Sequence, residues 1–194
     1  EAEAASLQGG EDNPGFSLTA PLIHRMVQAI TLGDLLQKVH LRTRPYEAVP
    51  GSADSLMRRW TTIVREHFLN GGHSTTWGRR TSYKAMINSI VDNFEHLELV
   101  DGPRKPRVGV LGEILVQFHP DANNHIVETI ESEGCEAVLP GLMWFVYNCL
   151  SAGDYNYKTF GTDKWSRHVK KAFRALLMQY QKPVTTALRK STRF

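Results

Sequence analysis

One segment constrains the fold of this chain more than any other. Between residues 107 and 140, two short β-branched runs, "RVGVLG" and "CEAVLP", enclose the helical pattern "DANNHIVETIESEG". Pro106 and Gly112 bound the first run, and Gly134 ends the helical pattern. A strand, a helix and a second strand within about 35 residues predict a parallel βαβ unit with buried strands.

The preceding residues are predicted to be mostly helical, because their apolar residues recur at helical spacing. Residues 21–40 indicate two helices with a break at Gly33-Asp34. Two further helices are expected over about 54–69 and 81–97, and the segment "GGHSTTWGRR" between them is expected to be a loop.

The segment "RTRPYEAVPGSAD" is predicted to be a loop as well, because Pro45 and Pro50 exclude a continuing helix. Ser52 or Asp54 is the expected cap of the helix that follows.

Two helices are expected after the βαβ unit. The apolar segment "GLMWFVYNCLS" is predicted to be buried on most sides. The segment "TDKWSRHVKKAFRALLMQYQ" is predicted to be an amphipathic helix, capped by Thr162 and closed by Pro183.

These patterns predict an α/β fold, in which a mostly helical N-terminal region precedes a partial flavodoxin-like or Rossmann-like parallel βαβ subdomain. We expect a disordered tail at 1–20, a helical region at 21–100 and an α/β subdomain at 107–194 with a basic C-terminal helix. The Pro- and Gly-rich segment "VDGPRKPR" marks the boundary. Two strands are too few for a complete doubly wound sheet, and the chain starts without Met, so we expect a piece of a longer protein.

A ligand-binding crevice is predicted at the carboxyl end of the first strand, where open α/β sheets bind their ligands. Gly112 allows close backbone approach, and Glu113 can accept hydrogen bonds or a proton. Asn123 and Asn124 precede a helix N-terminus, which suits an anion. The alternative is that Gly112 serves the turn and Asn123 caps the helix.

No established catalytic fingerprint accompanies this crevice. The chain contains neither G-x-G-x-x-G nor G-x-x-x-x-G-K-[ST], which argues against ATP hydrolysis by this piece, and neither H-E-x-x-H nor G-x-S-x-G. His119 and His125 flank the loop without metal-site spacing. The catalytic residues are therefore unknown from the sequence, and no metal site is predicted.

The two cysteines, Cys135 and Cys149, are too few for a four-thiolate cluster or a disulfide framework. Cys149 is expected to be a small buried hydrophobe, and it remains a weak candidate for a cluster ligand. Reduced thiols and the lack of a membrane-length apolar run make the cytoplasm the expected location.

The charge is distributed unevenly. Residues 158–194 contain ten Lys or Arg and one acid, a net charge of +9, whereas the remainder contains 13 basic and 19 acidic residues, a net charge of −6. A basic end can be a solvated face, or it can dock on an acidic neighbouring domain. Nucleic acid is the least favoured partner, since no nucleic-acid motif accompanies the charge.

Several of these motifs together resemble a known family. The stretch from "RVGVLGEILVQFHPDANN" to "GLMWFVYNCL", with the upstream "RPYE" segment, is similar to the dehydratase-component-like region of the large 2-hydroxyacyl-CoA dehydratase activase-related proteins. The resemblance covers about residues 35–149. The Gly-Glu-Ile and Ala-Asn-Asn signatures carry most of it.

The resemblance implies a module of an ATP-driven electron-transfer activator or dehydratase-like protein. A [4Fe–4S] cluster and ATP would belong to the parent protein, with no cofactor in this piece. The implied partners are the remaining domains of the parent chain and an iron–sulfur dehydratase or reductase. This piece lacks the phosphate-binding motifs, so we expect it to be non-catalytic. The alternative is an interaction or scaffold domain that docks through its basic C-terminal helix.

Overall fold

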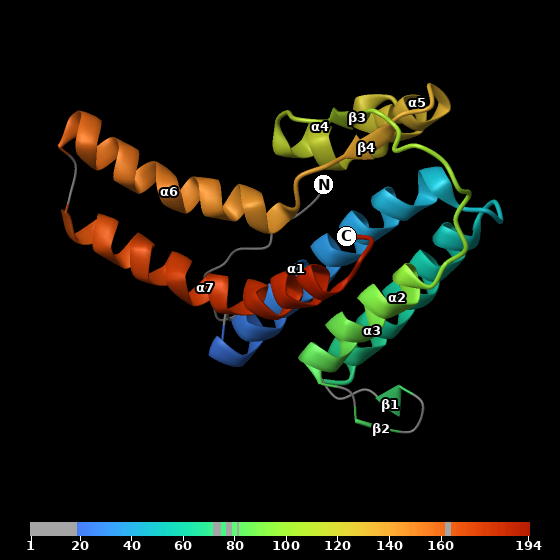
Figure 1. The fold of residues 1–194 in the computed structure, drawn as a ribbon. Helices are drawn as coiled ribbons and strands as arrows, with labels where there is room; N and C mark the ends of the chain where they lie inside the picture. The colour runs from blue at the N-terminus through green and yellow to red at the C-terminus, as the bar shows by residue number, and fades with distance from the viewer. Residues whose placement is uncertain (1–18, 72–74, 77–78, 81, 162–163) are drawn as a thin grey trace, which may run out of the picture.

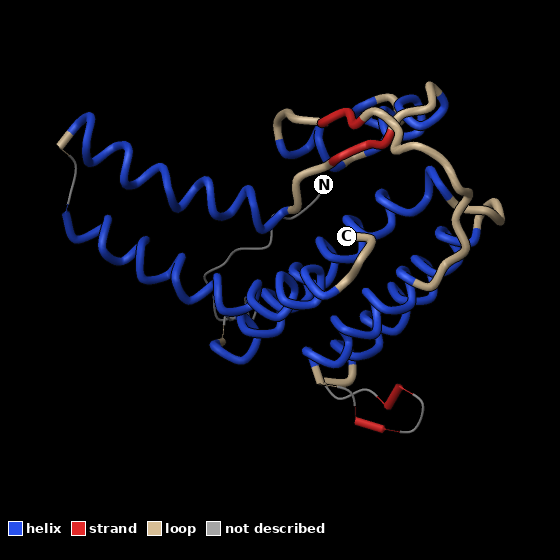
Figure 2. The backbone as a smooth tube through the Cα atoms, in the orientation of Figure 1, coloured by secondary structure: helices blue, strands red, loops and turns tan. Residues whose placement is uncertain are grey.

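The computed structural model describes residues 19–71, 75–76, 79–80, 82–161 and 164–194, and the chain in it is mostly helical (Figure 1; Figure 2). A small parallel sheet whose strands are separated by helices confirms the predicted fold class. Most of the predicted tail lies outside the described residues. The elements are α1 (Ala20–Thr43), η1 (Arg44–Tyr46), α2 (Ser52–Leu69), β1 (Thr75–Thr76), β2 (Arg79–Arg80), α3 (Tyr83–Glu95), β3 (Arg107–Gly109), α4 (Ile114–Phe118), η2 (Pro120–Asn123), α5 (Ile126–Ser132), β4 (Glu136–Val138), α6 (Leu142–Phe160) and α7 (Lys164–Lys190).

The main hydrophobic core lies among α1, α2, α3 and the C-terminal part of α7. Trp60 of α2 and Phe94 of α3 are its largest members, and both are almost fully buried. Val184 and Ala187 bring α7 into the same core, so the C-terminal helix closes a bundle that the N-terminal helices begin (Figure 1). The other buried members are Leu32, Leu35, Leu36, Val39, Met86, Ile87, Ile90 and Val91.

The first helix is continuous where the sequence predicted two helices with a break. Helix α1 runs through Gly33 and Asp34 without interruption. A glycine inside a helix costs only about 1 kcal/mol relative to alanine. Leu32, Leu35 and Leu36 are buried on either side of it, and burying a leucine contributes about 1.5–3 kcal/mol each. Tertiary packing therefore outweighs the local preference of Gly33.

The start of α2 is capped by Glu47, a residue that local sequence patterns do not indicate. The Glu47 carboxylate accepts hydrogen bonds from the backbone N–H groups of Gly51 at 2.6 Å and Ala53 at 2.8 Å. The expectation that Ser52 or Asp54 caps this helix is wrong. The helix begins at Ser52 after Gly51, which has φ 82° and no side chain, so Glu47 reaches across the turn instead.

Helix α3 forms as expected, with the Ser82 hydroxyl accepting a hydrogen bond from the Ala85 N–H at its start. The segment before it, expected to be a loop, contains a short antiparallel pair. Strand β1 pairs with β2 in the register Thr75 to Arg80.

The predicted βαβ unit is confirmed. Strands β3 and β4 pair in parallel, with Arg107 opposite Glu136 and Gly109 opposite Val138, and α4, η2 and α5 lie between them. The expectation of two buried strands holds only for β4. This strand packs against α1, whereas all three residues of β3 are exposed on the outer side of the pair.

Helix α6 is not buried on most sides, contrary to the sequence-based expectation. Met143 is buried, but Trp144 is 50% exposed and Phe160 is 71% exposed. Helix α6 packs along α7, and the two helices extend away from the rest of the molecule as a hairpin (Figure 1). We call residues 142–161 and 164–176 of this hairpin the α6–α7 arm. No helix in the described part of the chain is long and apolar enough to cross a membrane.

Helix α7 continues through Pro183 to Lys190, so the expectation that Pro183 closes it is wrong. A proline inside a helix removes one backbone hydrogen bond. Leu177 is buried before that point, and Val184 and Ala187 pack in the core after it. The predicted cap Thr162 lies outside the described residues.

Candidate functional site

The predicted crevice residues Gly112 and Glu113 lie on the surface after β3. Gly112 is exposed, and a Cβ built there would meet no atom within 4 Å. The Glu113 carboxylate accepts hydrogen bonds from the N–H groups of Leu115, at 2.9 Å, and Val116, at 3.4 Å. In this geometry Glu113 caps α4.

Asn123 ties the same loop together. Its Nδ2 donates to the Val116 carbonyl at 2.9 Å, and its Oδ1 accepts from the Ile126 N–H at 3.2 Å. Asn124 is exposed and has φ 55° in the left-handed region. The structure therefore brings Asn123 next to the helix that Glu113 caps, with both side chains engaged in local backbone bonds.

A concave site with several polar lining residues lies elsewhere, between α1, β4, the start of α6 and the second half of α7. This cavity has a volume of about 460 Å³, and none of the four predicted crevice residues lines it. We call it the α1–β4 cavity. Its polar lining residues include Asp34, Lys38, Arg42, Glu136 and Tyr147.

Asp34 joins the cavity to the start of α6. Its two carboxylate oxygens accept hydrogen bonds from the N–H groups of Leu142 and Met143, both at 2.8 Å. The first N–H groups of a helix have no acceptor within the helix and carry partial positive charge, so a carboxylate is a favourable partner for them. Burial nevertheless raises the pKa of Asp34 above its ordinary value, against the lowering effect of the two backbone bonds.

Glu136 is a second acid in the wall of the cavity, and only 1% of it is exposed. Its Oε1 pairs with Arg107 Nε at 3.0 Å, and its Oε2 accepts from the Tyr46 hydroxyl at 2.9 Å. The Tyr46 hydroxyl also accepts a hydrogen bond from the Lys105 N–H at 3.0 Å. Both oxygens of this buried acid are thus paired within the protein.

Two hydrogen-bond donors of the cavity, in contrast to its acids, lack partners among the residues that the structure describes. Arg42 Nε and the Tyr147 hydroxyl are buried, and neither has a hydrogen-bond partner within the described residues. Lys38, one turn from Arg42 on α1, forms no ion pair in that same part of the chain. Burial raises the pKa of the Tyr147 phenol, and the nearby Asp34 charge adds to this effect.

An apolar groove of about 520 Å³ lies beside this cavity, between α1 and α4. Ile30, Leu115 and Phe118 supply much of its lining, and His119 lies at its edge. The groove is the concave feature nearest to the predicted crevice, because α4 follows Glu113 directly.

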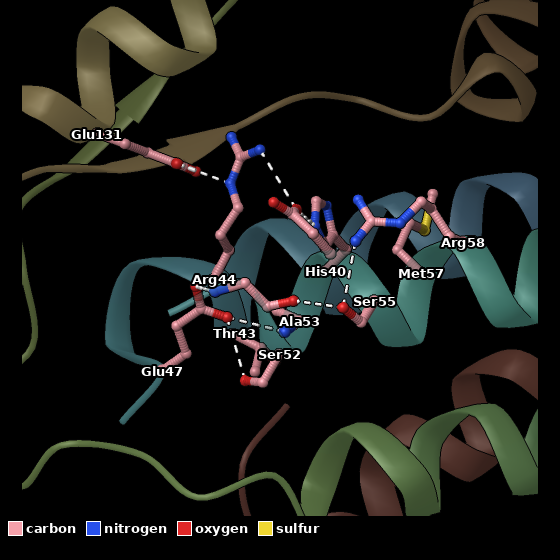
Figure 3. A network of polar contacts seen from close by, with 12 residues as sticks. His40, Thr43, Arg44, Glu47, Ser52, Ala53, Ser55, Met57, Arg58 and Glu131 are labelled. Carbon is pink, nitrogen blue, oxygen red and sulfur yellow. Dashed lines mark hydrogen bonds and ion pairs between the residues drawn. The ribbon is translucent and has the colours of Figure 1, made fainter. Parts of the chain in front are cut away.

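A polar junction ties the βαβ unit to α1 and α2 (Figure 3). Arg44 Nε pairs with Glu131 of α5 at 2.7 Å, and Arg44 also lies 3.7 Å from Asp54 of α2. Oδ1 of Asp54 lies 2.6 Å from Nε2 of His40, within hydrogen-bond distance. Burial lowers the pKa of His40, while the Asp54 carboxylate raises it by a smaller amount.

The junction explains the "RPYE" segment in structural terms. Arg44 reaches α5, Tyr46 reaches the buried Glu136 of β4, and Glu47 caps α2. Each side chain holds a different element against the end of α1. The segment therefore positions the βαβ unit on the helical bundle.

The cysteines do not form a metal centre in the described chain. Cys135 is half-buried, whereas Cys149 is exposed on α6, so the expectation of a buried Cys149 is wrong. No group of three or more His, Cys, Asp or Glu residues among the described ones is arranged to hold a metal ion.

The α6–α7 arm carries many exposed apolar side chains, and exposed basic side chains lie on its helix α7. Arg167 of α7 lies over the Tyr157 ring of α6 at 4.8 Å, which fixes the two helices together near the tip. Lys171 and Arg174 are exposed on the same helix. The exposed apolar residues of the arm are Trp144, Phe145, Tyr155, Phe160, Trp165, Val169, Phe173 and Leu176.

Comparisons with known proteins add no family to this description. No protein-family model matches the chain. No curated protein and no solved structure matches it at a significant level.

The residues of the α1–β4 cavity were not predicted from the sequence. Asp34 was interpreted only as part of a helix break, and Arg42 and Tyr147 attracted no interpretation. An acidic residue inside a short strand pattern, Glu136 in "CEAVLP", was the one available signal, because a buried carboxylate requires partners.

Proposed function

We propose that this chain is a non-catalytic binding module that docks through the α6–α7 arm. The number of large apolar side chains exposed on the arm is the observation that carries the proposal. Exposed apolar patches mark interaction sites, and aromatic residues dominate the binding energy of interfaces. The neighbouring Lys171 and Arg174 favour a partner whose surface is apolar and acidic.

The proposed partner is a neighbouring domain of the parent chain. The residues outside 158–194 carry a net charge of −6, whereas α7 is basic. An acidic domain elsewhere in a longer protein would therefore complement the charge of α7. Attraction between opposite charges raises the association rate and is screened by salt.

The test is the association of this chain with the flanking domains of its parent protein, measured by calorimetry at low and high salt. We expect Phe173→Ser with Leu176→Ser to weaken binding at least about tenfold, as loss of central apolar contacts does. Leu69→Ser, at a residue of α2 that is 76% exposed, is the matched control and should bind like the wild type. Equal binding by the arm variant and the control would refute docking through the arm.

We propose further that the parent is an ATP-driven electron-transfer protein related to 2-hydroxyacyl-CoA dehydratase components. The support is the resemblance of residues 35–149; Cys149, the candidate ligand, is exposed on α6, so its thiol is open to a cluster shared with another domain. In this proposal ATP and a [4Fe–4S] cluster belong to the parent, and the module itself performs no chemistry.

Anaerobic reconstitution with iron and sulfide tests this second proposal. The isolated chain should develop no thiolate-to-iron absorbance. The parent protein should develop it, and Cys149→Ser should lower its iron content while Cys135→Ser leaves it unchanged. A parent protein without bound iron would exclude the relationship.

A further inference from the structure

We propose that the α1–β4 cavity binds a small organic monoanion, a carboxylate with an apolar chain. The cavity shares Trp144 and Tyr147 with the base of the arm, but its proposed ligand does not depend on the docking proposal. The cavity volume of about 460 Å³ lies within the range of small-molecule pockets. Leu35, Val184 and Trp144 line it, so an apolar chain would find apolar walls.

The charge state of the cavity favours an anion. Its two acids, Asp34 and Glu136, already hold backbone or side-chain donors on both oxygens. The cations Lys38 and Arg42 have no acidic partner in the described residues, and the Arg42 Nε atom is buried. A buried donor without an acceptor costs free energy, which an anionic ligand would recover.

The chemistry of the unpaired donors favours a carboxylate. Arg42 can present a planar guanidinium to two oxygens, and the buried Tyr147 hydroxyl supplies a further donor without a partner of its own. The Asp34 carboxylate lines the same cavity, and its negative charge disfavours a second charge on the ligand, as a phosphate would carry. A singly charged carboxylate therefore fits better than a phosphate ester.

Calorimetric titration of the full chain with octanoate tests the proposal. We expect saturable one-to-one binding, at least about tenfold weaker binding of the neutral octanamide, and weaker binding of octyl phosphate. No saturable heat with octanoate would overturn the proposal. Equal affinity for octanamide would overturn the role of the cations, and tighter binding of octyl phosphate would overturn the choice of a carboxylate.

Variants locate the binding site. Arg42→Gln should weaken octanoate binding at least about tenfold, and Tyr147→Phe should weaken it several-fold. Arg25→Gln, on the exposed N-terminal part of the same helix, is the matched control and should bind like the wild type. Lys38→Gln changes an exposed side chain and should not impair folding. It therefore tests the role of the cations if Arg42→Gln does not fold. Wild-type affinity in folded Arg42→Gln, Lys38→Gln and Tyr147→Phe together would place octanoate elsewhere and refute the site.

Discussion

The carboxylate of Asp34 fills the space that a side chain at Gly141 would need. A Cβ built on Gly141 would lie 2.5 Å from both Cγ and Oδ2 of Asp34. The same carboxylate accepts hydrogen bonds from the first N–H groups of α6. Gly141 thus allows α1 and the start of α6 to meet, and this contact forms one corner of the α1–β4 cavity.

Gly141→Ala should therefore destabilise the protein by about 1–3 kcal/mol, because the added methyl group forces Asp34 away from α6. Urea denaturation measures the loss. Gly33→Ala is the matched control, since its Cβ would meet nothing within 4 Å and alanine is the better helix former. We expect the control to gain about 0.5–1 kcal/mol. A loss of stability in the control as large as that at Gly141 would contradict the close-contact argument.

Tyr46→Phe should cost about 1–3 kcal/mol in unfolding free energy. The substitution leaves Oε2 of the buried Glu136 without its hydrogen-bond donor and also frees the Lys105 N–H. Tyr155→Phe changes a tyrosine that is 64% exposed on α6 and should leave stability unchanged. If both substitutions have equal effects in thermal denaturation, the Tyr46 bond contributes nothing specific.

The stability contributed by His40 should fall as the pH drops below about 6.5, the ordinary pKa of histidine. Burial lowers the pKa of His40, so the unfolded chain binds a proton in a pH range where the folded chain does not. Stability therefore rises with pH through that range. Asp34 and Glu131 act in the opposite direction, because burial raises the pKa of both carboxyls.

A comparison with His40→Gln isolates the histidine. The variant should lose less stability than the wild type when the pH is lowered from about 7 to about 5, a range that includes the ordinary pKa of histidine. His168→Gln, at an exposed position of α7, should follow the wild-type profile. Parallel pH profiles for the wild type and His40→Gln would show that the junction histidine is not coupled to folding.

Adjacent leucines of α7 should respond very differently to truncation. Leu177 is 3% exposed, and Leu177→Ala should cost about 2–5 kcal/mol by leaving a cavity. Leu176 is 55% exposed, and Leu176→Ala should change stability by less than about 0.5 kcal/mol. Chemical denaturation of the two variants decides whether this face of α7 is open in solution, since similar losses would mean that Leu176 is covered.

Local patterns in the sequence were sufficient for most elements of the fold. Helical spacing located α2 and α3, and the β-branched runs located the parallel pair β3 and β4. The errors occurred where distant contacts decide. Burial of Leu32 and Leu35 carries α1 through Gly33, and Leu177 with Val184 carries α7 through Pro183.

The surface exposure of α6 and the composition of the cavity were beyond local patterns. The apolar residues of α6 predict burial, but nothing in their spacing states whether the covering surface belongs to this chain. Asp34 meets the α6 N-terminus across 108 positions of sequence, and Tyr46 meets Glu136 across 90. Such pairs become visible only when the fold brings the segments together.

The continuity of α7 connects the arm directly to the core. Its 27 residues span about 40 Å as a single helix. One end carries the exposed face of the arm, and the other is anchored in the core, where the guanidinium of Arg193 just beyond it donates to the carbonyl of Phe94. Val184 lies on this anchored part and also lines the α1–β4 cavity. A partner that moves the arm would therefore also displace Val184 in the cavity wall. A ligand in the cavity would in turn restrict the movement of the arm.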